Sequence, residues 1–154
     1  MDTVNHFLSH HPFFQGFEPH RLNLIVGCAR EVEYKDNQYL FREGEKAGDF
    51  FVLREGRARL ETHNARDGAV DVQTIEPGDV LGWSWLMSPH TWHFDARALR
   101  ATKAVALDGE KLRKLFEEDH TLGFRFMKKM LHVMEQRLQA TRLRLMDLDR
   151  TLTA

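Results

Sequence analysis

The sequence predicts a mainly β fold with helices: a β jelly-roll (double-stranded β-helix) barrel with N-terminal helices and a long C-terminal dimerisation helix. Three observations lead to this prediction. Seven short β-rich runs follow one another between residues 32 and 107, with turn residues between them. Helical patterns occupy both ends of the chain. Finally, no Gly/Ser/Pro-rich linker divides the 154 residues, so we expect a single domain over residues 1–154.

Residues 1–31 are expected to form short helices. Pro19 is a favourable first helical residue, and the apolar stripe after it suits one helix face: Leu22, Ile25, Val26 and Ala29. Cys28 falls inside this helical pattern, where we expect a small buried apolar side chain.

Residues 32–108 are expected to form the jelly roll. The β-rich runs cover residues 32–35, 38–42, 49–54, 57–62, 70–75, 94–98 and 104–107. Turn signals separate them, among them Glu43-Gly44, Glu55-Gly56 and Pro77-Gly78-Asp79.

Residues 109–154 are expected to form two helices. Asp108 is a suitable N-cap for a short helix that carries Leu112, Leu115 and Phe116. A second helix, without internal proline, is predicted from about Thr121 to about Asp149.

The long helix has a heptad-like apolar repeat, which is typical of a coiled-coil seam and predicts a homodimer. The repeat comprises Phe124, Met127, Leu131, Met134, Leu138, Thr141, Leu145, Leu148 and Leu152. We assign dimerisation to six of these residues: Leu131, Met134, Leu138, Thr141, Leu145 and Leu148. The alternative is a helix that lies on its own barrel, and a second, partly apolar face could make that contact: Phe126, Met130, Val133, Arg137 and Met146.

Composition and charge exclude several classes of protein. The net charge is -1, which provides no overall attraction to nucleic acid or to an anionic membrane. Basic residues outnumber acids on the long helix, which suits either a solvated surface or contact with nucleic acid. Cys28 is the only cysteine, so an internal disulfide and a cysteine-built zinc site are excluded. Without a signal peptide or an apolar run of about 20 residues, we expect a cytoplasmic protein with no membrane partner.

Four short motifs, in order along the chain, carry a resemblance to a known family: YLFREG (39–44), DFFVL (49–53), EGRA (55–58) and IEPGDVLG (75–82). In this order the chain resembles the cyclic nucleotide-binding domain, the sensor half of the catabolite-activator and fumarate-nitrate regulator superfamily. The motifs' glycines fit turns that need positive φ or close packing.

The resemblance implies a phosphate-binding cassette over residues 78–101. In the family, a short helix after the last glycine offers N–H groups to a cyclic phosphate, a glutamate holds the ribose and an arginine pairs with the phosphate. Here Trp83 stands at the glutamate position and Asp95 at the arginine position. The implied ligand-binding residues are Gly82, Trp83, Ser84, Trp85, His93, Asp95, Arg97 and Ala98.

Two interpretations of this cassette stay open. Arg97, with His93 or His90, could meet an anion after a small register change, and Ser84 could contribute to an anion-binding nest. Alternatively, Asp95 and Arg97 pair with each other.

The three tryptophans, Trp83, Trp85 and Trp92, could fill the pocket or line it as an aromatic wall for a planar ligand other than cyclic AMP.

Other chemistry finds little support. The spacing His90-x-x-His93-x-Asp95 fits no standard zinc pattern, so we predict no metal site, although either histidine could serve as an axial haem ligand. Ser84 lacks the second glycine of a hydrolase elbow, so we do not expect an enzyme. We assign no certain cofactor and expect, at most, a nucleotide-like or other small effector.

Three functions remain open from the sequence. The first is a stand-alone sensor domain without a helix-turn-helix, which dimerises and transmits ligand state through its long helix and the hinge near residues 108–121. The second is a degenerate, non-binding scaffold for a protein partner, and the third is an accessory that binds nucleic acid through the basic helix. We take Ala154 as a natural end and so do not expect direct DNA binding; in a longer chain, the domain would be the sensor half of a transcription regulator.

Overall fold

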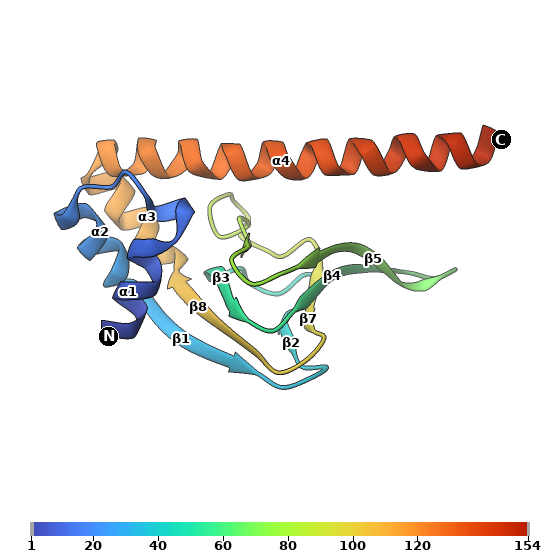
Figure 1. Ribbon diagram of the computed structural model, residues 1–154, viewed down its shortest axis with the longest axis horizontal. Coiled ribbons are helices and arrows are strands. Elements are labelled where there is room, and N and C mark those ends of the chain that lie inside the picture. Colours follow the sequence, from blue (N-terminus) through green and yellow to red (C-terminus); the bar gives the residue numbers. More distant parts are fainter. Residues whose placement is uncertain (1, 154) are drawn as a thin grey trace.

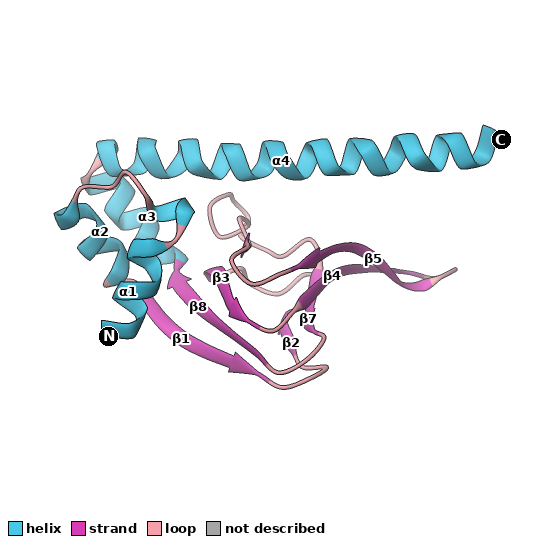
Figure 2. Cartoon of the chain, viewed as in Figure 1, coloured by secondary structure: helices cyan, strands magenta, loops and turns pink. Residues whose placement is uncertain are grey.

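The computed structural model describes residues 2–153, and its elements follow the predicted order of helices, strands and helices (Figures 1 and 2). This part of the chain begins with α1 (Asp2–His10), the 3-10 turn η1 (Pro12–Phe14) and α2 (Pro19–Val26). Its strands are β1 (Ala29–Tyr34), β2 (Tyr39–Phe41), β3 (Asp49–Glu55), β4 (Ala58–Asn64), β5 (Gly68–Ile75), β6 (Val80–Leu81), β7 (Asp95–Ala98) and β8 (Thr102–Asp108). The helices α3 (Gly109–Glu118) and α4 (His120–Thr153) follow.

The strands form two four-stranded antiparallel sheets, with strand orders β1-β8-β3-β6 and β2-β7-β4-β5. Phe41 of β2 and Phe51 of β3 meet between the sheets, with ring centroids 6.0 Å apart. The predicted jelly roll is confirmed, but its closure into a barrel is wrong. The strand ladder does not continue from one sheet to the other: the edge strands β1 and β6 of one sheet pair with neither β2 nor β5 at the edges of the other.

Strand β3 lies at the centre of the core and is covered on both faces. Its residues Phe50 to Leu53 are all buried, which explains a continuous apolar run in place of the usual alternation. Phe50 packs against Phe13 and Phe126 from the helical side, with ring centroids 5.3 and 5.7 Å away. The helices therefore complete the core, and α4 is anchored in it by an aromatic residue.

Local capping explains where the helices begin. Pro19 occupies the first turn of α2, as predicted. The Asp108 carboxylate accepts the N–H of Lys111 and caps α3, which confirms Asp108 as the predicted N-cap. Asp119, between α3 and α4, accepts the N–H of Leu122 in the same way. The 34 residues of α4 make a helix of about 50 Å that runs along the jelly roll past β5 (Figure 1).

Two local predictions were wrong at the start of the jelly roll. Ala29 begins β1 and pairs with Leu107, so it does not continue the stripe of α2. Cys28 is buried as expected, but it lies in the connection after α2. Cross-strand pairing with β8 overrides the helical periodicity here. Strand β6 was not predicted, since two residues are too few to show a β pattern.

Among the described residues, no helix combines the length and apolar character needed to cross a membrane.

Candidate functional site

The segment 78–101 leaves the sheet after β6 and returns to it as β7. The turn before β6 is fixed by two backbone bonds between Leu53 and residues Gly78 and Asp79, at 2.8 and 2.9 Å, while the Asp79 carboxylate accepts the N–H of Glu76. Between the strands the chain is irregular, with an isolated bridge between Lys46 and Thr91. Backbone hydrogen bonds also join His90 and Trp92 to residues 44–47, so the end of the segment is tied to the connection between β2 and β3.

Trp92 occupies the interior of the segment. Its ring is stacked on Phe41, with centroids 3.7 Å apart and planes 10° from parallel, and only 5% of the residue is exposed. Gly82 makes this packing possible: its φ is +92°, and a Cβ there would lie 2.8 Å from Cη2 of Trp92. The cavity beside Trp92 has a volume of about 20 Å³, which is room for about one water molecule.

Trp85 points away from that cavity into the helical part of the core. It is fully buried, its ring lies 6.1 Å from Phe126 of α4 and 6.2 Å from Phe116 of α3, and its Nε1–H donates to the carbonyl of Gly82 at 2.7 Å. The guanidinium of Arg113 donates to the carbonyl of Trp85. Trp85 therefore links the segment to the base of both C-terminal helices.

Trp83 lies at the outer side of the segment, under α4. It is half-buried, and the guanidinium carbon of Arg137 lies 5.0 Å from its ring centroid, which is a cation–π arrangement. The buried Ser84 and the exposed His93 line the same small cavity as Trp83 and Gly82. The structure thus brings four of the predicted ligand residues together around a space that Trp92 has largely filled.

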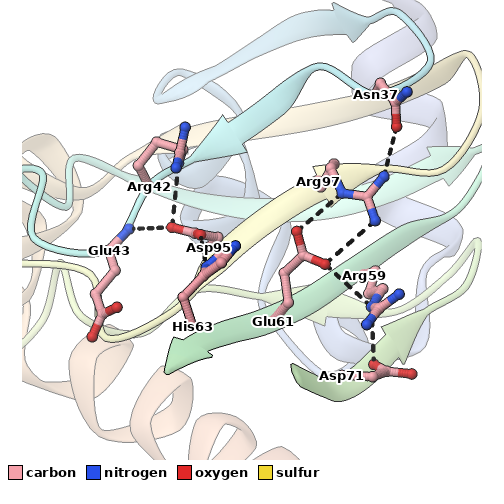
Figure 3. Close-up of polar contacts among 9 residues, drawn as sticks. All are labelled: Asn37, Arg42, Glu43, Arg59, Glu61, His63, Asp71, Asp95 and Arg97. Carbon is pink, nitrogen blue, oxygen red and sulfur yellow. Dashed lines mark hydrogen bonds and ion pairs between the residues drawn. The ribbon is translucent and has the colours of Figure 1, made fainter. Parts of the chain in front are cut away.

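Asp95 does not line this cavity. Its carboxylate accepts the N–H of Glu43 at 2.7 Å, lies 2.9 Å from Nδ1 of His63 and forms a longer ion pair of 3.4 Å with Arg42 (Figure 3). Asp95 is 3% exposed, so these polar partners compensate for the burial of its carboxylate.

Arg97 also has its own partners. Nε and Nη2 donate to the two carboxylate oxygens of Glu61 at 3.0 and 3.4 Å, and Nη1 donates to Asn37 at 2.6 Å (Figure 3). Arg59 approaches the same carboxylate at 3.2 Å. The hydrogen bond to Glu61 raises the pKa of Arg97. Asp95 and Arg97 therefore belong to separate polar clusters, and the direct pair between them that we considered is wrong.

The remaining predicted residue, Ala98, is fully buried, and its backbone N–H and C=O bond to Gln38 and Asn37. Its main chain is thus engaged in the connection before β2.

From the sequence, Arg137 was placed on one face of the long helix but was not assigned to the site. It lines the small cavity and also a larger groove on the other side of the segment. Burial lowers the pKa of Arg137 to about 10, an effect that nearby Asp79 partly opposes. The signal in the sequence was a single cation in the otherwise apolar row Phe126, Met130, Val133.

Comparisons with known proteins point to one family. The profile of the family described as "Cyclic nucleotide-binding domain" matches residues 31–119. Cyclic nucleotide-gated ion channel 18 of Arabidopsis thaliana is 30% identical over 112 residues, which cover 66% of this chain but 16% of that protein. A crystal structure from Geobacter metallireducens GS-15, described as a cyclic nucleotide-binding protein, is 25% identical, with a TM-score of 0.77 over 90% of this chain and 99% of that one. A cyclic nucleotide-binding domain from Methylobacillus flagellatus KT shares the fold at 13% identity, with a TM-score of 0.79 over 95% of this chain and 82% of that one.

Proposed function

This chain belongs to the cyclic nucleotide-binding domain family, and within it we propose a homodimeric sensor that transmits its ligand state through α4. Membership of this family makes the chain a regulatory domain of the cyclic nucleotide-binding type. The dimer, the nature of the effector and the transmission are the proposal.

The dimer proposal rests on the exposed apolar residues along the outer face of α4. Phe126 and Met130 are buried in the core, whereas Leu131, Leu138 and Leu145 are 65%, 57% and 60% exposed. From residue 134 to residue 151, every residue except Arg137 is exposed. Most of the stability of a helix in a protein comes from the packing of an apolar face, which this stretch of α4 largely lacks. A second copy of α4, packed along the exposed seam, would bury these leucines and support the helix.

Substitutions along the seam test the dimer. Leu138→Lys with Leu145→Lys places two charges on the proposed seam, and we expect sedimentation to show a monomer. Leu143→Lys is the matched control, because Leu143 is 62% exposed but lies two residues from Leu145, on another side of the helix. A wild-type protein that sediments as a monomer, or a control that dissociates equally, contradicts the proposal.

For the cassette, we propose that a cyclic nucleotide is not held in the family's usual way. Three observations support this: Trp83 follows Gly82, Asp95 and Arg97 are engaged elsewhere, and about 20 Å³ is free beside Trp92. Titration with cyclic AMP and cyclic GMP at millimolar concentration should change neither tryptophan fluorescence nor melting temperature. Stabilisation by either nucleotide would contradict this part of the proposal.

The filled cassette also favours a second candidate, a non-binding scaffold for a protein partner. Trp92 stacked on Phe41 is the observation that supports it. A scaffold should respond to no small effector at all, whereas a sensor should respond to at least one. The two candidates therefore differ in the outcome of a wider small-molecule thermal-shift series.

A further inference from the structure

We propose that the groove between α4 and the jelly roll binds a small organic anion, a carboxylate or a phosphate monoester with an apolar part. The groove has a volume of about 670 Å³, within the usual range for small-molecule sites. One wall is α4; the other is formed by η1 with His11 and by the turn at Gly78–Val80. It is separate from the small cavity beside Trp92, although Arg137 lines both.

The charges that line the groove are unbalanced. Lys128, Lys129 and Arg137 all come from α4, whereas Asp79 is the one acidic residue of the lining. The Asp79 carboxylate already accepts the N–H of Glu76 at 2.8 Å. Within the described part of the chain, none of the three cations has a carboxylate within 4.0 Å. An anion is the ligand that this surplus of positive charge favours.

Arg137 is the cation with most to gain from such a ligand. It donates to the carbonyl of Val80, but its Nη1 is buried and has no hydrogen-bond partner among the described residues. A buried guanidinium nitrogen without a partner is costly. Lys129, which also lines the groove, has no carboxylate partner; its Nζ lies 5.6 Å from the centroid of the Phe17 ring, and burial lowers its pKa. A carboxylate or phosphate in the groove would supply acceptors to the Arg137 guanidinium.

The remaining residues of the lining indicate that the ligand has an apolar part as well as an anionic one. Pro12, Phe13, Val80, Val133 and Ala140 provide apolar surface around the cations. His11 adds no charge, because its Nδ1 accepts the N–H of Phe13 and its Nε2 donates to the carbonyl of Gly78, so the ring is neutral. An anionic head near Arg137 with an apolar body fits this combination of surfaces.

Three small aromatic probes test the site: phenyl phosphate, benzoate and the neutral benzamide. With purified full-length protein, we expect phenyl phosphate, benzoate or both to raise the melting temperature in a concentration-dependent manner, and benzamide to have no effect. Comparing the two anions distinguishes a phosphate ligand from a carboxylate. Stabilisation by benzamide as large as that by the anions, or no stabilisation by either anion at millimolar concentration, overturns the proposal.

Variants locate the response in the groove. Arg137→Gln should weaken anion binding at least about tenfold, the usual effect of losing a hydrogen bond to a charged group. Arg144→Gln is the matched control: Arg144 lies about two turns further along α4 and also donates to a carbonyl, that of Val72, but it does not line the groove. Lys129→Gln provides a second variant if Arg137→Gln fails to fold, and a smaller loss of anion affinity is expected. Unchanged anion affinity in the folded variants overturns the proposal.

Discussion

Replacing Gly82 by alanine tests whether Trp92 fills the cassette in solution. Gly82 has a φ of +92°, and an added Cβ would lie 2.8 Å from the Trp92 ring. The left-handed backbone costs an L-residue about 1–2 kcal/mol, and displacing a buried indole adds about 1–3 kcal/mol. We therefore expect Gly82→Ala to lower the free energy of unfolding by about 2–5 kcal/mol.

A second glycine separates the two contributions. Gly78 has the same φ of +92°, but a Cβ there would have no neighbour within 4 Å, so Gly78→Ala should cost only the backbone part, about 1–2 kcal/mol. Urea unfolding followed by circular dichroism gives both values. In a Trp92→Leu background, the cost of Gly82→Ala should fall towards that of Gly78→Ala; the remaining difference comes from the Asp49 carbonyl oxygen, which would lie 3.2 Å from the added Cβ. Equal costs for the two alanine variants in the wild-type background would refute the packing of Trp92 on Gly82.

Two further predictions concern buried polar groups. Burial lowers the pKa of His11 below its ordinary value of 6.5, so the unfolded chain takes up the proton first; the contribution of His11 to stability should be complete well above pH 6.5 and be lost as the pH falls below it. His11→Asn keeps a cap for the N–H of Phe13 and should remove this component from urea midpoints measured across that range. Glu61→Gln should cost about 2–3 kcal/mol in the same assay, because the Arg97 guanidinium loses a buried counter-ion. Asp71→Asn, at the exposed end of the same cluster, should change stability by less than about 1 kcal/mol, and equal losses for both variants would contradict this reasoning.

Much of the fold could be predicted because its signals are local. The run Phe50–Leu53 is apolar without alternation, and the structure buries that strand on both faces. Pro19 and Asp108 mark the helix starts where the structure has them. At Ala29, however, local periodicity predicted a helix, and pairing with β8 determined a strand.

The site was less predictable, because the directions of its side chains depend on distant residues. Three tryptophans within ten positions of an irregular segment show no period that would tell one ring from another. Trp92 turns inward where Phe41 offers a stacking surface, and Trp85 turns toward Phe126 of α4. The groove itself was not predicted, although a helix lying on its own barrel was one alternative, since the two walls are far apart in the sequence and meet only when α4 lies along the jelly roll.

These contacts also suggest how a ligand in the groove could act on the dimer. At the base of α4, Trp85 and Phe126 are both fully buried and in ring contact, so the cassette and the helix should move together there. Further along, α4 touches the jelly roll mainly through Arg137 and Arg144, which donate to backbone carbonyls. Polar contacts of this kind can exchange partners without opening a packed core. An anion that draws Arg137 away from Val80 and Trp83 would therefore release one of the few contacts that hold the outer part of α4, which carries the proposed dimer seam, while the base of the helix stays fixed.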